Sequence, residues 1–193
     1  MGKIAVDNLR MAISCFFDYE EGKVDIVEET EDTVNFLEHA ILSKLVELRT
    51  PDMHPQDLEL VYRMTLTVSD IERLSDHAEN IVEYARQVSG GQALLSQNAE
   101  RELRSMSELT LKSVELCLNI FQGGDYTRLP EAEDLEDQVD QAREKLIQSH
   151  VERFMDSTCD PRGGVVFSDM VTDLERCSDH AINIAASLRT DPT

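Results

Sequence analysis

The chain of 193 residues carries a formal net charge of −21, which excludes several classes of function. Nucleic-acid backbones and anionic membrane surfaces would repel such a chain, whereas cations and basic partner proteins are compatible with it. With 41% hydrophobic and 30% charged residues, few Gly and Pro and no Trp, the composition favours a folded helical protein over a β-sandwich or barrel.

The cysteines indicate a reducing compartment. Cys15, Cys117 and Cys177 lie in apolar helical stretches, where a reduced core thiol is the usual role. Together with Cys159 they show neither a CxxC motif nor zinc-ribbon spacing. The sequence shows no signal peptide and no apolar run of bilayer-spanning length. A cytoplasmic location is therefore expected.

Apolar residues recur at helical spacing nearly throughout the chain, and a few breaks divide it into six predicted helices. The predicted breaks are Gly22, the turn at Thr50-Pro51 and His54-Pro55, and the pairs Gly90-Gly91, Gly123-Gly124 and Gly163-Gly164, with Pro130 in a first helical turn and Pro161 in a loop. The expected helices span about 3–20, 24–49, 56–88, 93–122, 130–157 and 165–189. Short connections of this kind favour antiparallel neighbours, and therefore bundles.

One segment occurs twice and is the most informative feature of the chain. Residues 68–85 and 171–188 are identical at 10 of 18 positions, and most of the shared residues are polar. A repeat retained only for packing would share mainly apolar positions, so the match indicates that both copies perform the same chemistry.

The repeat extends to the preceding helices. Residues 31–35 read EDTVN and residues 136–140 read EDQVD, while the first and fourth helices match weakly. The order of the first three helices therefore equals the order of the last three. We predict an all-α fold of two tandem three-helix bundles, in domains 1–90 and 91–193, which arose by duplication.

A helical wheel separates apolar and acidic faces on these helices. The stripes predicted to face the core are Ile71, Leu74, Ala78, Ile81 and Ala85 on the third helix and Leu174, Cys177, Ala181, Ile184 and Leu188 on the sixth. Those of the second and fifth helices are Val34, Leu37, Ile41, Leu45 and Leu48, and Val139 and Leu146. Glu72, Asp76, Glu175 and Asp179 lie nearly opposite the core stripes, so the repeated acids are expected to face away from the core of their own bundle.

The acids form pairs spaced by four residues, and such residues adjoin on a helix surface. Two carboxylates there repel each other unless a cation lies between them, which favours a multivalent metal. The predicted metal ligands are Glu31, Asn35, Glu72 and Asp76 in the first repeat and Glu136, Asp140, Glu175 and Asp179 in the second. Oxygen ligands favour iron, manganese or magnesium over structural zinc. Asn35 stands where the second repeat has Asp140 and predicts that the first site is the weaker one; an ordinary solvated acidic face is the alternative.

The histidines and asparagines beside the acids have two open roles. His77 and His180 are either metal ligands or hydrogen-bonded, partly buried side chains, and the second role is favoured. Asn80 and Asn183 either join the metal shell or belong to a hydrogen-bond network.

The arginines of the repeat are expected to form ion pairs. Arg73 and Arg176 follow the first acid of each pair and are predicted to contact a neighbouring Asp, with anion binding as the alternative. Asp70 and Asp173 are expected to pair with these arginines.

At these residues the chain resembles a known family. The sequence (I/L)ERxSDHAxNI on the third helix of each repeat, preceded by ExxVN or ExxVD, is similar to the PhoU family of phosphate-uptake regulators, whose signature is a repeated E/D-x-x-x-D on helices. The resemblance covers roughly residues 3–189 and implies surface clusters of iron, with manganese, magnesium, zinc or nickel as alternatives, at the eight positions above. Asn35 departs from the motif, and Ser75 and Ser178 stand where Gly is common.

The resemblance also implies a function and partners. PhoU-like proteins are non-enzymatic negative regulators of phosphate import that contact the phosphate ABC transporter and a membrane sensor kinase. Similar domains form the cytosolic tail of bacterial sodium/phosphate cotransporters, where the partner would be the membrane domain, and the abrupt start at residues 3–11 suits such a tail. The sequence leaves open this choice, and also whether the chain forms a homodimer and whether phosphate itself binds.

Two further functions compete with regulation by a metal-binding protein. A di-iron carboxylate oxidase would need Glu-x-x-His motifs that point into the bundle core, and neither SDHA segment supplies one. A metal-free helical adaptor stays open. Hydrolytic chemistry is not expected, because no Gly-rich phosphate loop or nucleophile motif is present.

Overall fold

The computed structural model describes residues 1–50, 52–156 and 159–189, and within these ranges the chain is helical. Its elements are α1 (Gly2–Phe17), α2 (Glu21–Glu47), α3 (Pro55–Ser89), α4 (Gln97–Gly123), the short 3₁₀ turn η1 (Tyr126–Arg128), α5 (Leu129–Met155) and α6 (Pro161–Ala186). The predicted all-α class is confirmed, and the predicted helix end at residue 157 lies outside the described residues. No described helix combines the length and apolarity that crossing a bilayer requires.

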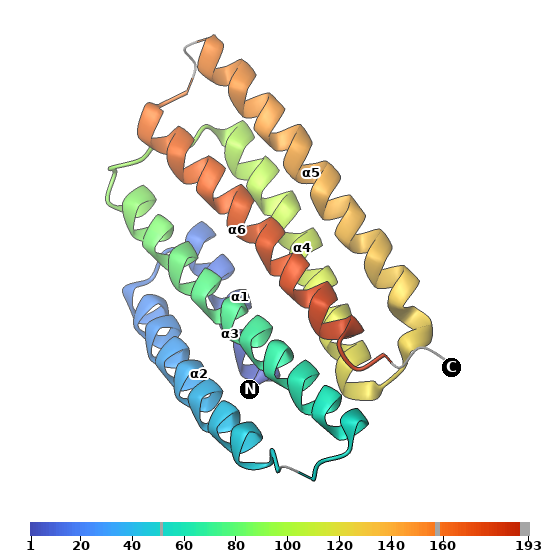
Figure 1. Cartoon of the computed structure of the whole chain (residues 1–193). Coiled ribbons are helices and arrows are strands. Elements are labelled where there is room, and N and C mark those ends of the chain that lie inside the picture. The colour runs from blue at the N-terminus through green and yellow to red at the C-terminus, as the bar shows by residue number, and fades with distance from the viewer. Residues whose placement is uncertain (51, 157–158, 190–193) are drawn as a thin grey trace.

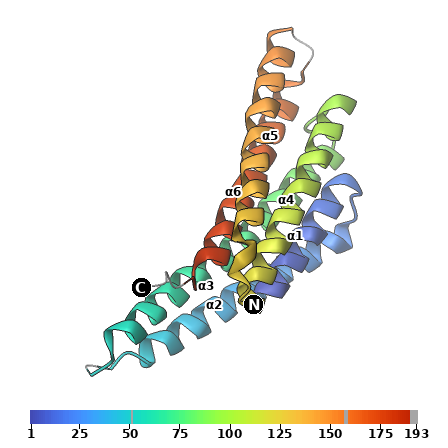
Figure 2. The same ribbon diagram turned by 90° about the vertical axis from the view of Figure 1, so that its right-hand side faces the viewer.

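The helices form two three-helix bundles that lie side by side, as predicted (Figure 1). Helices α1, α2 and α3 pack on one another, and α4, α5 and α6 do the same. The bundles meet where α3 contacts α6 and α1 contacts α4, so α2 and α5 lie at the outer edges. From the centre, the α2–α3 and α5–α6 hairpins extend in different directions (Figure 2). Buried residues of both bundles form one continuous core, and the domain boundary at 90/91 stays a prediction.

Local sequence signals explain the ends of α4 and α6. The Ser96 hydroxyl accepts a hydrogen bond from the Ala99 amide at 3.2 Å, which begins α4, and Gly124 ends it in the left-handed conformation with φ of 67°. The Asp160 carboxylate accepts from the Gly163 amide at 2.7 Å, and Pro161 occupies the first turn of α6.

Two predicted breaks are wrong. Gly22 lies inside α2, since α1 already ends at Phe17, and the pair Gly163-Gly164 lies inside α6 rather than in a turn before it. Pro161, predicted in a loop, starts this helix because its fixed backbone angle and missing amide hydrogen suit a first turn.

The two glycines of α6 are there because other parts of the chain approach them closely. A Cβ atom on Gly163 would lie 2.0 Å from the backbone oxygen of Leu94, and one on Gly164 would lie 2.8 Å from Cε1 of His150. These positions therefore serve packing between α6, α5 and the segment before α4, and not a chain reversal.

The predicted core stripes are confirmed on α3 and α6, apart from Leu188, which is only half-buried. On α2 the prediction is partly wrong: Val34 is fully buried, but Leu48 is 58% exposed. The start of α1 at Gly2 lies against Ile71, so the end of α2 and the beginning of α3 extend past α1. Beyond α1, the end of α2 and the beginning of α3 have only each other as neighbours within the first bundle. Their apolar faces are therefore partly exposed.

Buried polar contacts tie the helices of each bundle together. Ser75 is fully buried, and its hydroxyl accepts a hydrogen bond at 3.0 Å from Nδ2 of Asn8, which also donates to the Val27 backbone oxygen at 3.2 Å. In the second bundle, the buried Ser178 hydroxyl lies 2.8 Å from that of Ser113. The serines of the repeat thus each link the third helix of a bundle to its first helix.

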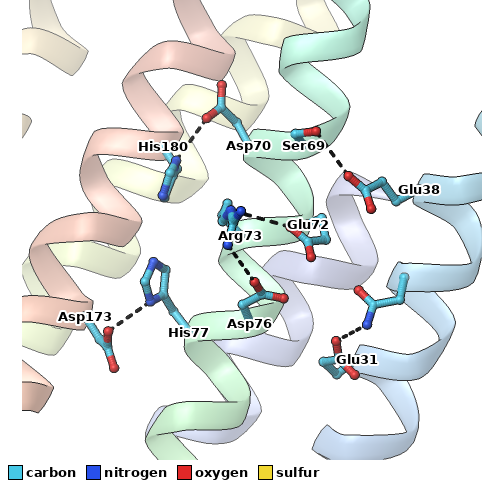
Figure 3. A network of polar contacts seen from close by, with 11 residues as sticks. Glu31, Glu38, Ser69, Asp70, Glu72, Arg73, Asp76, His77, Asp173 and His180 are labelled. Carbon is cyan, nitrogen blue, oxygen red and sulfur yellow. Dashed lines mark hydrogen bonds and ion pairs between the residues drawn. The ribbon is translucent and has the colours of Figure 1, made fainter. Parts of the chain in front are cut away.

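The seam between the bundles is crossed by two equivalent His–Asp contacts (Figure 3). Nδ1 of His77 lies 2.9 Å from Asp173, and Nδ1 of His180 lies 2.9 Å from Asp70. The two imidazole rings stack with centroids 5.7 Å apart. Asp173, which is 8% exposed, also accepts a hydrogen bond of 2.8 Å from the Tyr84 hydroxyl. Each bundle therefore supplies one acid and one histidine to the seam.

The close packing of α6 predicts opposite effects for two Gly→Ala substitutions. Gly163→Ala should destabilise the protein by about 1–3 kcal/mol, since its methyl group would overlap backbone atoms that cannot move freely. Gly22→Ala should stabilise it by about 0.4–1 kcal/mol, because its Cβ would enter open space and the unfolded chain loses freedom. Denaturant unfolding followed by circular dichroism measures both, and equal effects would contradict this packing.

The seam predicts unequal effects for its two aspartates. Asp173→Ala leaves both His77 and Tyr84 without their acceptor and should destabilise the protein by about 2–4 kcal/mol, whereas Asp70→Ala, with one such partner in His180, should cost about 1 kcal/mol. Adding Tyr84→Phe to Asp173→Ala should recover part of the loss, because it removes the stranded hydroxyl. Equal unfolding free energies for the two single variants would contradict the prediction.

Candidate metal centre

The predicted ligands of the first repeat gather where α2 and α3 run alongside each other (Figure 3). We call Glu31 and Asn35 of α2 with Glu72 and Asp76 of α3 the first acidic patch. Glu72 and Asp76 were expected on the face of α3 opposite the core, but their side chains are only 17% and 31% exposed. A helical wheel of α3 shows only how residues are distributed around that helix. In the structure α2 packs beside the acidic face of α3 and covers it partly.

Glu31 and Asn35 form one side of the first acidic patch. Glu31 is 8% exposed, and Nδ2 of Asn35 donates a hydrogen bond to its carboxylate. Burial raises the pKa of Glu31, and the negative charge of Glu79 adds to this effect. The Oδ1 atom of Asn35 is buried and accepts no hydrogen bond from the described residues. A buried acceptor of this kind suits a water molecule or a cation.

Glu72 and Asp76 form the other side of the patch. Burial, and then the neighbouring charge of Asp76 and that of Glu38, raise the pKa of Glu72 to about 7. Arg73 offsets this only partly: its guanidinium lies 3.3 Å from Asp76 and 3.8 Å from Glu72, and its own side chain is 58% exposed. Near neutral pH the patch therefore holds more negative charge than the protein neutralises.

The second acidic patch, Glu136 and Asp140 of α5 with Glu175 and Asp179 of α6, has the same layout. Three of its residues, Glu136, Asp140 and Asp179, each place a carboxylate oxygen within 4.8 Å of the others. Glu175 instead lies between two arginines, 3.6 Å from Arg143 and 3.7 Å from Arg176. Burial raises the pKa of Glu136, Glu175 and Asp179, and the neighbouring carboxylates raise it further.

Two residues that the sequence analysis did not single out contribute to these patches. Glu38 on α2 adds its charge beside Glu72, and its carboxylate accepts a hydrogen bond of 3.1 Å from the Ser69 hydroxyl. Arg143 on α5 stands at the equivalent repeat position and contacts Glu175. Both follow the second predicted ligand of their helix by three residues, and this spacing would have placed them on the same face.

The arginines of the repeat behave as predicted. Arg73 forms an ion pair with Asp76, and Arg176 lies 3.7 Å from Asp179. The expectation that Asp70 and Asp173 pair with these arginines is wrong. Both aspartates point to the other bundle, because the adjacent bundle brings a histidine to each of them.

The histidines of the repeat lie at the seam between the bundles. His77 and His180 are hydrogen-bonded and partly buried, which confirms the favoured role, and their Nδ1 atoms are engaged by aspartates of the seam. Asn80 and Asn183 are exposed.

Each patch can hold a cation with oxygen ligands. Three carboxylates from two neighbouring helices converge in the second patch, and in the first patch acids of two neighbouring helices lie beside the buried amide oxygen of Asn35. Hard cations take carboxylate and amide oxygens as ligands, so the donor set fits iron, manganese or magnesium. A bound ion would relieve the repulsion between these carboxylates and connect the second helix of a bundle to the third.

Two proteins with known names are similar to nearly the whole chain in sequence. The phosphate-specific transport system accessory protein PhoU homolog of Xylella fastidiosa is 23% identical over 188 residues, which cover 97% of this chain and 77% of the relative. The homolog of the same name from Pseudomonas aeruginosa is 26% identical over 194 residues, covering 96% of this chain and 76% of that protein.

The fold is likewise similar to a solved structure. The crystal structure of PhoU from Pseudomonas aeruginosa superposes with a TM-score of 0.86 at 25% identity and covers 97% of this chain and 89% of that one. The model of the PhoU domain matches twice, at residues 1–85 and 103–188, one match for each three-helix bundle. The chain therefore belongs to the PhoU domain family.

Proposed function

We propose that this protein is an accessory regulatory protein of a phosphate transport system that binds metal ions at its two acidic patches. It acts at the cytoplasmic side through contacts with the transporter or its membrane domain, and with a sensor kinase, rather than by catalysis. Curated relatives from several bacteria carry the name of phosphate-specific transport system accessory proteins, which supports the transport context.

The observation that carries metal binding is the convergence of three carboxylates in the second patch, at positions that the first patch repeats with Asn35 in place of Asp140. Both bundles bring acids from two neighbouring helices to the same repeat positions, and burial together with like charge raises the pKa of the central members. Crowded carboxylates destabilise a protein unless something neutralises them. That the same arrangement occurs twice favours a ligand over chance, and the oxygen donors favour iron, with manganese, magnesium, zinc and nickel as alternatives.

The geometry favours a regulatory role over an oxidase. A di-iron oxidase places Glu and His ligands inside a bundle, whereas the acids here lie on α2 and α3 and on α5 and α6, with side chains that are partly exposed on α3 and α6. The two histidines of the repeat hold the seam instead of facing these acids. A metal ion at either patch would change how firmly two long helices are connected, and such a change can be transmitted to a partner protein.

Metal content tests the proposal directly. The double variant Asp140→Asn/Asp179→Asn keeps the shape of the second patch but removes two of its three converging carboxylates. Protein purified without chelator should lose about half of its bound metal in this variant, because one of two patches no longer provides charged ligands. Elemental analysis by mass spectrometry gives the metal content per chain.

A matched control neutralises two acids outside both patches. Asp25 on α2 and Glu108 on α4 are exposed, so Asp25→Asn/Glu108→Gln changes the net charge equally and should leave the metal content unchanged. If both variants and the parent hold the same amount of metal, the ligand assignment is wrong, and a metal-free adaptor that binds the transporter becomes the better description.

The raised pKa of Glu72 predicts how stability depends on pH. In the unfolded chain this carboxyl titrates near 4.5, and in the folded protein near 7, so the folded state holds its proton more firmly between these values. The stability of the metal-free protein therefore falls as pH rises from about 4.5 to 7. Glu72→Gln should remove the part of this decline that Glu72 causes and make the metal-free protein more stable than the parent at pH 8 by about 1 kcal/mol, since solvent screens a partly exposed group.

Denaturant unfolding at pH 5 and pH 8 in the presence of a chelator measures this difference. Glu108→Gln, at an exposed position on α4, serves as the control and should change stability equally at both pH values. A constant difference between Glu72→Gln and the parent at both pH values would refute a strained carboxylate at this position.

A further inference from the structure

The two acidic patches contain the same number of carboxylates but not the same number of cations. In the first patch, Asn35 replaces the acid that the second patch has at Asp140, yet Glu38 adds a carboxylate beside Glu72. The second patch has Arg143 at the position equivalent to Glu38. With Glu38 counted, each patch thus has four carboxylates, the first has Glu79 as a further acid beside Glu31, and the second has one arginine more.

Arg143 is placed to act on the second patch. Its guanidinium lies 3.6 Å from Oε1 of Glu175, whose other oxygen lies 3.7 Å from Arg176. Glu175 is thus held on both sides and is not among the three residues whose oxygens converge within 4.8 Å. Its equivalent, Glu72, faces Arg73 on one side only and has the carboxylates of Asp76 and Glu38 as its other neighbours.

We propose that Arg143 is a built-in counter-cation of the second acidic patch, which withdraws Glu175 from the ligand set and weakens metal binding there. The inference rests on the proposed metal-binding function. A metal ion at the second patch is held by Glu136, Asp140 and Asp179, and recruits Glu175 only when Arg143 moves away. At the first patch Glu38 supplies an acid where the second patch has a competing cation.

The effect follows from Coulomb's law. A positive charge close to a divalent ion opposes its binding, and solvent screens this repulsion. Arg143 is 42% exposed, so we expect a moderate effect of about tenfold in affinity. The second patch therefore fills only at a higher metal concentration than it would without Arg143.

The test measures one patch at a time by calorimetric titration with Mn²⁺ at pH 7.5. In the first background, Glu72→Gln/Asp76→Asn, the first patch is disabled and the titration measures binding at the second patch. In the second background, Asp140→Asn/Asp179→Asn, the second patch is disabled and the titration measures binding at the first patch. In the first background, Arg143→Glu should tighten Mn²⁺ binding at least about tenfold and Arg143→Gln by somewhat less. In the second background, Glu38→Arg should weaken binding by a similar factor. Arg101→Glu, the same change of charge at an exposed residue of α4, should leave both affinities unchanged.

A double-mutant cycle tests the role of Glu175 itself. With Arg143 present, Glu175→Gln should change the Mn²⁺ affinity of the second patch less than about twofold, since Glu175 is not a ligand there. In the Arg143→Gln protein, Glu175→Gln should weaken Mn²⁺ binding about tenfold, because Glu175 is then free to act as a metal ligand. Circular dichroism of every variant establishes that the helices are intact.

The outcomes separate the inference from the function on which it rests. If the parent protein binds no Mn²⁺ or other metal at either patch, the proposed function fails and the inference fails with it. If both patches bind metal but Arg143→Glu leaves the second affinity within about twofold of its background, the inference is overturned while the proposed function stands. Equal effects of Glu175→Gln with and without Arg143 would also overturn it.

Discussion

The packing of α3 against α6 is the constraint on which the rest of this structure depends. It joins the two bundles through crossed contacts, each made of an acid from one bundle and a histidine from the other. Because this seam occupies one face of each helix, and the apolar core of each bundle another, only the face toward α2 or α5 is left for the acids of the repeat. Five of the seven polar residues shared by the two copies can be understood from this division. The serine ties the helix to its own bundle, the Asp and His cross the seam, and the Glu and second Asp form the acidic patch.

The seam is satisfied within the protein, whereas the patches are not. Asp173 accepts hydrogen bonds from the two bundle-crossing partners His77 and Tyr84, and burial and the nearby carboxylate raise the pKa of that tyrosine. In the acidic patches, carboxylates are instead crowded against one another. The neighbouring arginines Arg73 and Arg176 are more than half exposed, so solvent screens their charge. A fold that gives its central acids hydrogen-bond partners and leaves the acids of its patches crowded favours a cation at the patches.

The sequence predicted the helices, the repeat and the placing of the candidate ligands on neighbouring helices of each bundle, because all three follow from periodicity and from identical spacing in the two copies. It could not predict what lies opposite a side chain on another bundle. The sequence therefore pairs Asp70 and Asp173 with arginines of their own helix, although histidines of the neighbouring bundle lie 2.9 Å away. The break predicted at Gly163 and Gly164 is wrong for the same reason, since only the tertiary structure shows how closely the chain before α4 and a histidine of α5 approach these glycines.

The two halves have diverged in an uneven way that fits these roles. The helices that form the seam retain the same acid, histidine and serine in both copies, since a change on one side would leave a buried partner unsatisfied on the other. The outer helices α2 and α5 face a patch that no second bundle constrains, and there Asn35 stands against Asp140 and Glu38 against Arg143. Differences at the outer helices change the charge of a patch without disturbing the seam. Duplication thus gives two sites that share one framework and can differ in their affinity for a cation.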